Sequence, residues 1–141
     1  MTEKQAAWIE ELINDGKATT EVKLLDNKVT ALITNLQGDT QLKAEEKMKS
    51  IDGTPAFVVH TYSVLILSQV LKGYAIAKKK LDFKNTDEAY AFIVTLPTGI
   101  IDALVKAHSN FEKELAKLIT GDDVVENFTT PPETASALKV N

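Results

Sequence analysis

Hydrophobic and polar positions along the chain follow two different periods, and these periods predict where helices and strands lie. Near the N-terminus, apolar residues from Trp8 to Ile13 recur at the i, i+1, i+4, i+5 spacing of one helical stripe. Thr2 is a favourable residue for the start of a helix, and Gly16 can adopt the left-handed conformation that ends one. The pattern therefore predicts a helix within residues 1–16.

The next segment, 19–36, changes to the two-residue period of a strand. Apolar residues alternate with charged ones before the turn sequence Asp26-Asn27-Lys28, and Val29, Ala31 and Ile33 alternate with other residues after it. Two such runs joined by a short Asp/Asn turn predict a β-hairpin over about residues 20–36. Because a lone hairpin is only marginally stable in water, this one is expected to pack on helices or to pair with an edge of another chain.

The most hydrophobic segment predicts a single long helix over residues 54–80. Thr54 is a suitable N-cap, and Pro55 fits the first helical position, where its missing N–H costs nothing. The polar residues of the segment form one narrow stripe, so the helix is expected to be buried by neighbours on several sides. The lysine run 78–80 is interpreted as a helix end, where cations oppose the negative end of the helix dipole.

The same hydrophobic segment is the candidate for a membrane span, over Pro55–Ala77. It is long enough to cross the hydrocarbon layer, but several polar residues interrupt it, and Lys72 lies well inside it. A lysine at that depth is costly. We therefore expect a helix in the core of a folded domain and no membrane partner.

Further helices are predicted over residues 41–50, 85–96 and 99–119. The fold class predicted is α+β, mainly α: a helical bundle around a central buried helix, with an N-terminal helix and one β-hairpin. One compact domain is expected over residues 1–119, with its helical core in 40–119.

After residue 119 the periodic pattern ends. Residues 120–141 contain a small apolar cluster followed by two prolines, and this composition favours an extended C-terminal tail. An extended tail and a hairpin are both able to contact another chain. The candidate partner-binding residues are therefore Val29, Ala31, Ile33, Val124, Val125, Phe128, Pro131 and Pro132.

The charge composition argues against a nucleic-acid partner. The chain of 141 residues has a net charge of −4, and all sixteen of its basic residues are lysine. Arginine provides the planar fork that pairs with phosphate and guanine, and nucleic-acid binding needs a basic surface. Cysteine is absent, which removes disulfides, thiolate metal sites and thiol nucleophiles from the possible chemistry.

Candidate catalytic chemistry is limited to two histidines, His60 and His108. Neither has a companion at the spacing of metal ligands, and each is interpreted as a core or interface histidine. His108 could form a dyad with Asp102 or Glu112, although Glu112 is simply its neighbour one helical turn away. No catalytic residue, metal or cofactor is predicted. The alternative is a small helical ligand-binding domain or enzyme with a pocket near His60 and His108.

The order of elements resembles the small tail-assembly and minor virion proteins of tailed bacteriophages. The resemblance covers Val22–Ile119 and is one of pattern. It consists of a β-rich segment, a charged helix closing on Ile51-Asp52-Gly53, a long apolar helix, the segment Thr86–Leu96 ending near a proline, and a last helix containing Phe111-Glu112-Lys113-Glu114.

The resemblance implies a non-enzymatic, protein-binding assembly component. The expected roles are a structural subunit of the virion, in its tail, baseplate or head, or a tail-assembly chaperone. The expected partners are other phage structural proteins or further copies of this chain, within an oligomer or larger assembly. The expected location is the virion, or the host cytoplasm during assembly.

Overall fold

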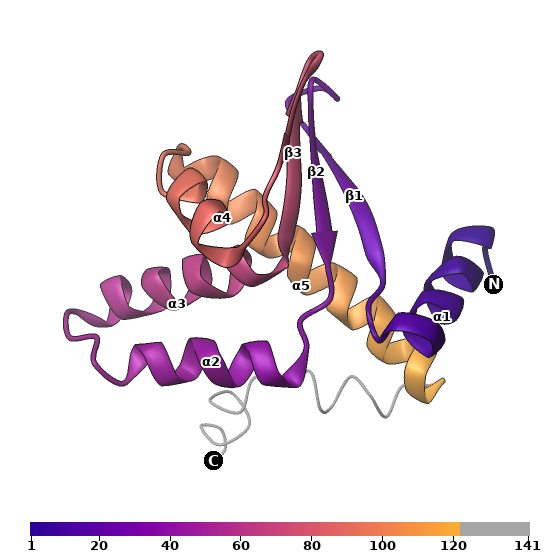
Figure 1. Ribbon diagram of the computed structural model, residues 1–141, viewed down its shortest axis with the longest axis horizontal. Helices are drawn as coiled ribbons and strands as arrows, with labels where there is room; N and C mark the ends of the chain where they lie inside the picture. Colours follow the sequence, from indigo (N-terminus) through magenta and orange to yellow (C-terminus); the bar gives the residue numbers. More distant parts are fainter. Residues whose placement is uncertain (122–141) are drawn as a thin grey trace.

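The structure, a computed structural model, describes residues 1–121. This part of the chain contains four antiparallel strands and five helices (Figure 1). The strands form one sheet in the order β1-β2-β3-β4. The fold is thus α+β and mainly α, as predicted. The elements are α1 (Glu3–Asp15), β1 (Thr19–Leu24), β2 (Val29–Thr34), α2 (Gly38–Met48), α3 (Pro55–Val70), β3 (Leu71–Ile76), β4 (Lys79–Asp82), α4 (Thr86–Ile93) and α5 (Thr98–Thr120).

The helix and the β-hairpin predicted within the first 36 residues are both present. The Thr2 hydroxyl accepts the N–H of Gln5, whose side chain accepts the N–H of Thr2, so a reciprocal capping box starts α1. Gly16 ends the helix in the left-handed region, at φ 70°. The β1–β2 turn holds Asp26 and Asn27 in the same region, at φ 56° and 65°, and these residue types tolerate it best after glycine.

The prediction of one helix over residues 54–80 is wrong beyond Val70. The chain passes from α3 into β3 without a loop, turns at Ala77-Lys78, and returns as β4. Lys79 and Lys80 therefore belong to a strand and do not cap a helix. The structure does not confirm a bundle around one central helix, because a second hairpin replaces the last third of that helix. Within residues 1–121, no helix combines the length and the apolar content needed to cross a bilayer.

Sheet packing explains why the helical pattern fails after Val70. Strand β3 lies between β2 and β4, so its backbone groups form hydrogen bonds on both sides. Tyr74 is buried in this position, and its ring contacts that of Phe92 at a centroid distance of 4.8 Å. Gly73 favours the change, because glycine costs a helix about 1 kcal/mol relative to alanine. Apolar residues that fit a buried helix fit a buried strand equally well.

Helix α5 packs against several other elements to form the core. It passes behind the strands in Figure 1 and contacts α1, α3, β1 and β2. At one end, Phe111 meets Trp8 edge-to-face with ring centroids 5.0 Å apart, and the Trp8 indole N–H donates to the Thr19 carbonyl at 3.0 Å. Core residues come from α1, β2, α3, β3, α4, α5 and the connection before β1: Trp8, Ala18, Val29, Ala31, Ile33, Val64, Leu67, Val70, Leu71, Tyr74, Ala89, Ile93, Ile101, Leu104, Phe111 and Leu115.

Helix α3 is buried only along its second half. The residues from Val64 to Val70 are mostly buried, whereas Pro55 to His60 are mostly exposed. The prediction that neighbours cover the helix all round is therefore wrong for its first two turns. Figure 1 shows the reason, because α2 and α3 extend away from the sheet and meet at a connection far from the strands.

Replacement of Leu67 by alanine tests the buried half of α3. The side chain is 1% exposed, so the substitution leaves a cavity and should lower the free energy of unfolding by about 2–5 kcal/mol. Val59→Ala is the matched control on the same helix, since Val59 is 65% exposed and should change that free energy by less than about 0.5 kcal/mol. Denaturant unfolding followed by circular dichroism measures both, and equal effects would contradict the placement of α3.

Candidate functional site

A polar cavity of about 480 Å³, here called the lysine pocket, lies at the base of the sheet. It lies where the end of β2, the start of α2, the α3–β3 junction and the start of α4 meet. All of its lining residues are polar or charged. They are Lys17, Thr34, Asn35, Gln37, Thr40, Lys43, Glu46, Lys47, Gln69, Lys72 and Thr86.

Helix α2 supplies one wall of the pocket. The backbone groups of Gln37, at the start of the helix, have hydrogen-bond partners within it. The Gln37 N–H donates to the Thr40 hydroxyl, and this hydroxyl donates to the Gln37 carbonyl at 2.8 Å. Ala44 is the only buried residue of this helix. Lys43 and Lys47 lie four residues apart, so they share the same face of α2 and both reach the cavity.

Lys72 enters the pocket from an irregularity in the sheet. The pairing of β2 with β3 shifts register between Leu32, opposite Gly73, and Ile33, opposite Leu71, so Lys72 has no partner residue in β2. Such bulges redirect a side chain relative to its neighbours. The Lys72 ammonium donates to the Gln69 carbonyl at 2.9 Å.

The positive charges of the pocket are not balanced within it. Burial lowers the pKa of Lys72 below its ordinary value, and the positive charge of Lys17 lowers this pKa further. The one carboxylate in the lining, that of Glu46, forms an ion pair with Lys49 at 3.1 Å. Among residues 1–121, no carboxylate lies at ion-pair distance from Lys17, Lys43, Lys47 or Lys72.

A second surface, here called the α3–α5 groove, is mostly apolar. It consists of two hollows of about 290 Å³ and 440 Å³ that share Ser63 and Val105. Beside it, the first turns of α3 leave large apolar side chains in solvent, with Phe57 51% and Val59 65% exposed. Exposed apolar side chains beside an apolar groove are typical of a contact surface for another protein.

The two histidines lie at the groove in different environments. His108 is buried, as predicted, and its Nε2–H donates to the Glu112 carboxylate at 2.9 Å. The same Glu112 oxygen accepts the backbone N–H of Leu36, so the pair ties α5 to the connection between β2 and α2. His60 is exposed on the outer half of α3, so the prediction that it lies in a buried helix is wrong.

The residues predicted to bind a partner do not form an exposed surface in the described part of the chain. Val29, Ala31 and Ile33 are all buried in the core, because their face of β2 turns towards α5. Strand β2 is also an inner strand, so the hairpin does not offer its second run as an edge. The other predicted residues lie outside the described residues: Val124, Val125, Phe128, Pro131 and Pro132.

The residues of the lysine pocket were missed because they come from four separate segments of the chain. The one local signal was the i, i+4 spacing of Lys43 and Lys47 on a charged helix, which is also the pattern of an ordinary solvated face. Phe57 and Val59 were assigned to the core because their segment is uniformly apolar. Neither surface could be found without the tertiary arrangement.

No group of three or more acidic or histidine side chains is placed to hold a metal ion within residues 1–121. No protein-family model matches the chain, and neither a curated protein nor a solved structure matches it significantly. The geometry of the two surfaces is therefore the basis for a functional proposal.

Replacement of Glu112 tests the link between α5 and the β2–α2 connection. Glu112→Ala leaves the Leu36 N–H and the His108 ring without their shared acceptor, and should lower the free energy of unfolding by about 1–3 kcal/mol. It should also speed amide hydrogen exchange at Leu36. Glu114→Ala is the control, since Glu114 is exposed two residues away. Unchanged exchange at Leu36 in the Glu112 variant would contradict the contact.

Proposed function

We propose that this protein is a non-enzymatic assembly component that works by binding another protein. The observation that carries the proposal is the exposed apolar surface at the start of α3, where Val59 lines the α3–α5 groove and Phe57, two residues earlier, is also exposed. Burial of a fully exposed side chain of this size contributes about 1.5–3 kcal/mol, so these two residues could act as the anchors of an interface.

The shape of the surface favours a helical partner. The groove runs between two helices, and its apolar lining includes Ala56, Val59, Ile66 and Val105. An amphipathic helix binds in such a groove by placing apolar side chains at i, i+3, i+4 and i+7.

We propose further that the partner is a structural protein of a tailed bacteriophage, or a second copy of this chain. The support is the order of elements in the sequence, with Ile51-Asp52-Gly53 before the long apolar helix and Leu96-Pro97 before the last one. On this proposal the chain serves as a subunit of the tail, baseplate or head, or as a tail-assembly chaperone. It would be found in the virion, or in the host cytoplasm during assembly.

A ligand-binding or enzymatic role at the two histidines is the alternative. The observation that favours it is that His108 lines one hollow of the groove and His60 lines the other. Replacement of both histidines by glutamine tests it. If a small ligand bound the normal protein and not this double variant, the alternative would be preferred over protein binding.

The apolar surface is tested with the double variant Phe57→Gln, Val59→Gln. Full-length tagged protein is used to capture partners from phage-infected cells, and its oligomeric state is measured by size-exclusion chromatography with light scattering. We expect the normal protein to capture an identified phage structural protein or a second copy of itself. The affinity of the double variant for that partner should be at least about tenfold lower, because both apolar side chains have been replaced.

The matched control is Leu25→Gln, Ile76→Gln. These residues are similarly exposed, at 60% and 49%, but Leu25 follows β1 and Ile76 ends β3, and the turns of the two hairpins lie far from the first turns of α3 (Figure 1). The control should bind as the normal protein does. A strictly monomeric protein without a partner, or equal loss of binding in the two double variants, would overturn the proposed surface.

A further inference from the structure

We propose that the lysine pocket binds an acidic peptide segment of the partner protein, with its four ammonium groups pairing with the carboxylates of that segment. This inference rests on the proposed function, because it names the chemistry of a second contact made by the same partner. The pocket and the apolar surface both involve α3, the pocket at its last turn through Gln69 and the apolar surface at its first turns.

The lysine pocket concentrates positive charge that no carboxylate of the pocket compensates. Residues 1–121 contain sixteen acidic residues and fifteen lysines, so acidic partners are plentiful in this part of the chain. Even so, four lysines face one cavity with a single carboxylate, and that carboxylate pairs with Lys49. Like charges that share a cavity repel one another, and an anion that enters removes this repulsion.

Lys72 is held in place by hydrogen bonds to both its backbone and its side chain. The register shift in β3 leaves it unpaired with β2, the Phe83 N–H donates to its carbonyl at 3.1 Å, and its ammonium donates to the Gln69 carbonyl. The side-chain oxygen of Gln69 accepts a hydrogen bond from the Thr86 hydroxyl at 3.3 Å. The Lys72 backbone is therefore held beside the end of β4, and its exposed ammonium is held by one contact with the last turn of α3, so part of the entropic cost of ordering it on binding has already been met.

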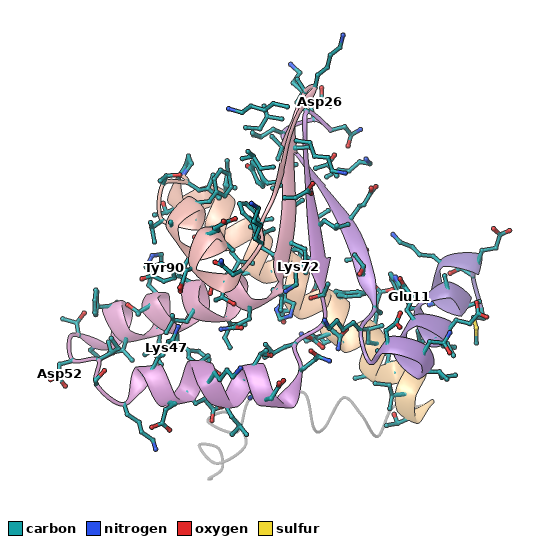
Figure 2. All side chains as sticks on the ribbon, viewed as in Figure 1. Glu11, Asp26, Lys47, Asp52, Lys72 and Tyr90 are labelled. Carbon is teal, nitrogen blue, oxygen red and sulfur yellow. The ribbon has the colours of Figure 1, made fainter. Side chains whose placement is uncertain are left out.

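Figure 2 locates the charges around the cavity. Lys47 lies on the side of α2 that faces α3, and Lys72 lies near the base of the strands. With Lys43 one turn before Lys47 on α2 and Lys17 beyond the end of α1, the charges come from three separated positions on the rim. An arrangement spread in this way suits several carboxylates along a segment better than one compact anion.

The neutral lining favours a peptide over a nucleic acid. Gln37 and Gln69 carry amide groups, which can hydrogen-bond to a peptide backbone. No aromatic side chain lines the pocket, so it has no surface on which a base could stack. The chain also lacks arginine, and its net charge of −4 opposes an extended polyanion. A short acidic segment meets only the positively charged cavity.

The experiment measures binding of a fluorescent hexaglutamate peptide to the full-length protein by anisotropy. The peptide is acetylated and amidated, and a hexaglutamine peptide of the same length is the neutral comparison. We expect hexaglutamate to bind and hexaglutamine not to bind. The affinity for hexaglutamate should fall as salt rises from about 0.02 M to about 0.2 M, because salt screens the pairing of charges.

The pocket variant is Lys43→Gln, Lys47→Gln, Lys72→Gln, and it should weaken hexaglutamate binding about tenfold or more. The control is Lys78→Gln, Lys79→Gln, Lys80→Gln, which removes the same number of charges from an exposed hairpin end. Both variants have the same net charge, so a difference between them reports the cavity. The control should bind hexaglutamate within about twofold of the normal protein.

Three results would overturn the inference: no binding of hexaglutamate, equal loss in the two variants, or tighter binding of inorganic phosphate or a single-stranded oligonucleotide than of hexaglutamate in the same cavity. None of these depends on Phe57 or Val59. Failure of the pocket would therefore leave the proposed function standing. Conversely, loss of partner capture through the apolar surface would leave the peptide result unchanged.

Discussion

The passage from helix to strand at Val70 and Leu71 is the constraint on which the rest of the structure depends. Both residues are almost fully buried, and no loop separates α3 from β3. The direction of α3 is therefore fixed by the direction of β3, which is held in the sheet on both sides. From this junction α3 extends away from the sheet, so only its second half reaches the core.

Both candidate surfaces follow from that geometry. At the junction, Gln69 and Lys72 are fixed beside the start of α2 and α4, and the polar cavity forms where these elements meet. At the far end, Phe57 and Val59 lie beyond the reach of the sheet, and the groove between α3 and α5 stays partly open. The pocket thus lies at the last turn of α3 and the exposed apolar side chains at its first turns. Electrostatic pairing speeds and orients association, whereas apolar burial contributes most of the affinity.

Local sequence signals predicted the beginnings of elements well. The Thr2 box, the Asp26-Asn27 turn and the Thr54-Pro55 start all lie where the pattern indicated, because caps and turns depend on contacts within a few residues. The end of α3 could not be predicted in the same way. Residues 71–76 are apolar enough for either a buried helix or a buried strand, and their pairing with β2, 38 to 47 residues earlier, decides between them.

In the candidate sites too, features set by local sequence could be predicted, whereas features set by distant contacts could not. His108 was correctly expected to be buried, because it lies on a clear apolar stripe of α5. The alternation of Val29, Ala31 and Ile33 correctly indicated one face of a strand, but the sequence alone did not show that α5 covers that face. Lys17 and Lys72 are fifty-five residues apart, and nothing local indicates that they share a cavity. Surfaces built from distant segments need the fold before they can be found.

The most direct test of this account is the backbone conformation of residues 71–76 in solution. Nuclear magnetic resonance of the isotope-labelled full-length protein gives Cα and Cβ chemical shifts for each residue and contacts between neighbouring strands. The account predicts a change from helical to strand shifts at Leu71, with contacts from Tyr74 to Ala31 on one side and to Leu81 on the other. Helical shifts that continue through Lys80, without these cross-strand contacts, would contradict it and remove the basis for both surfaces.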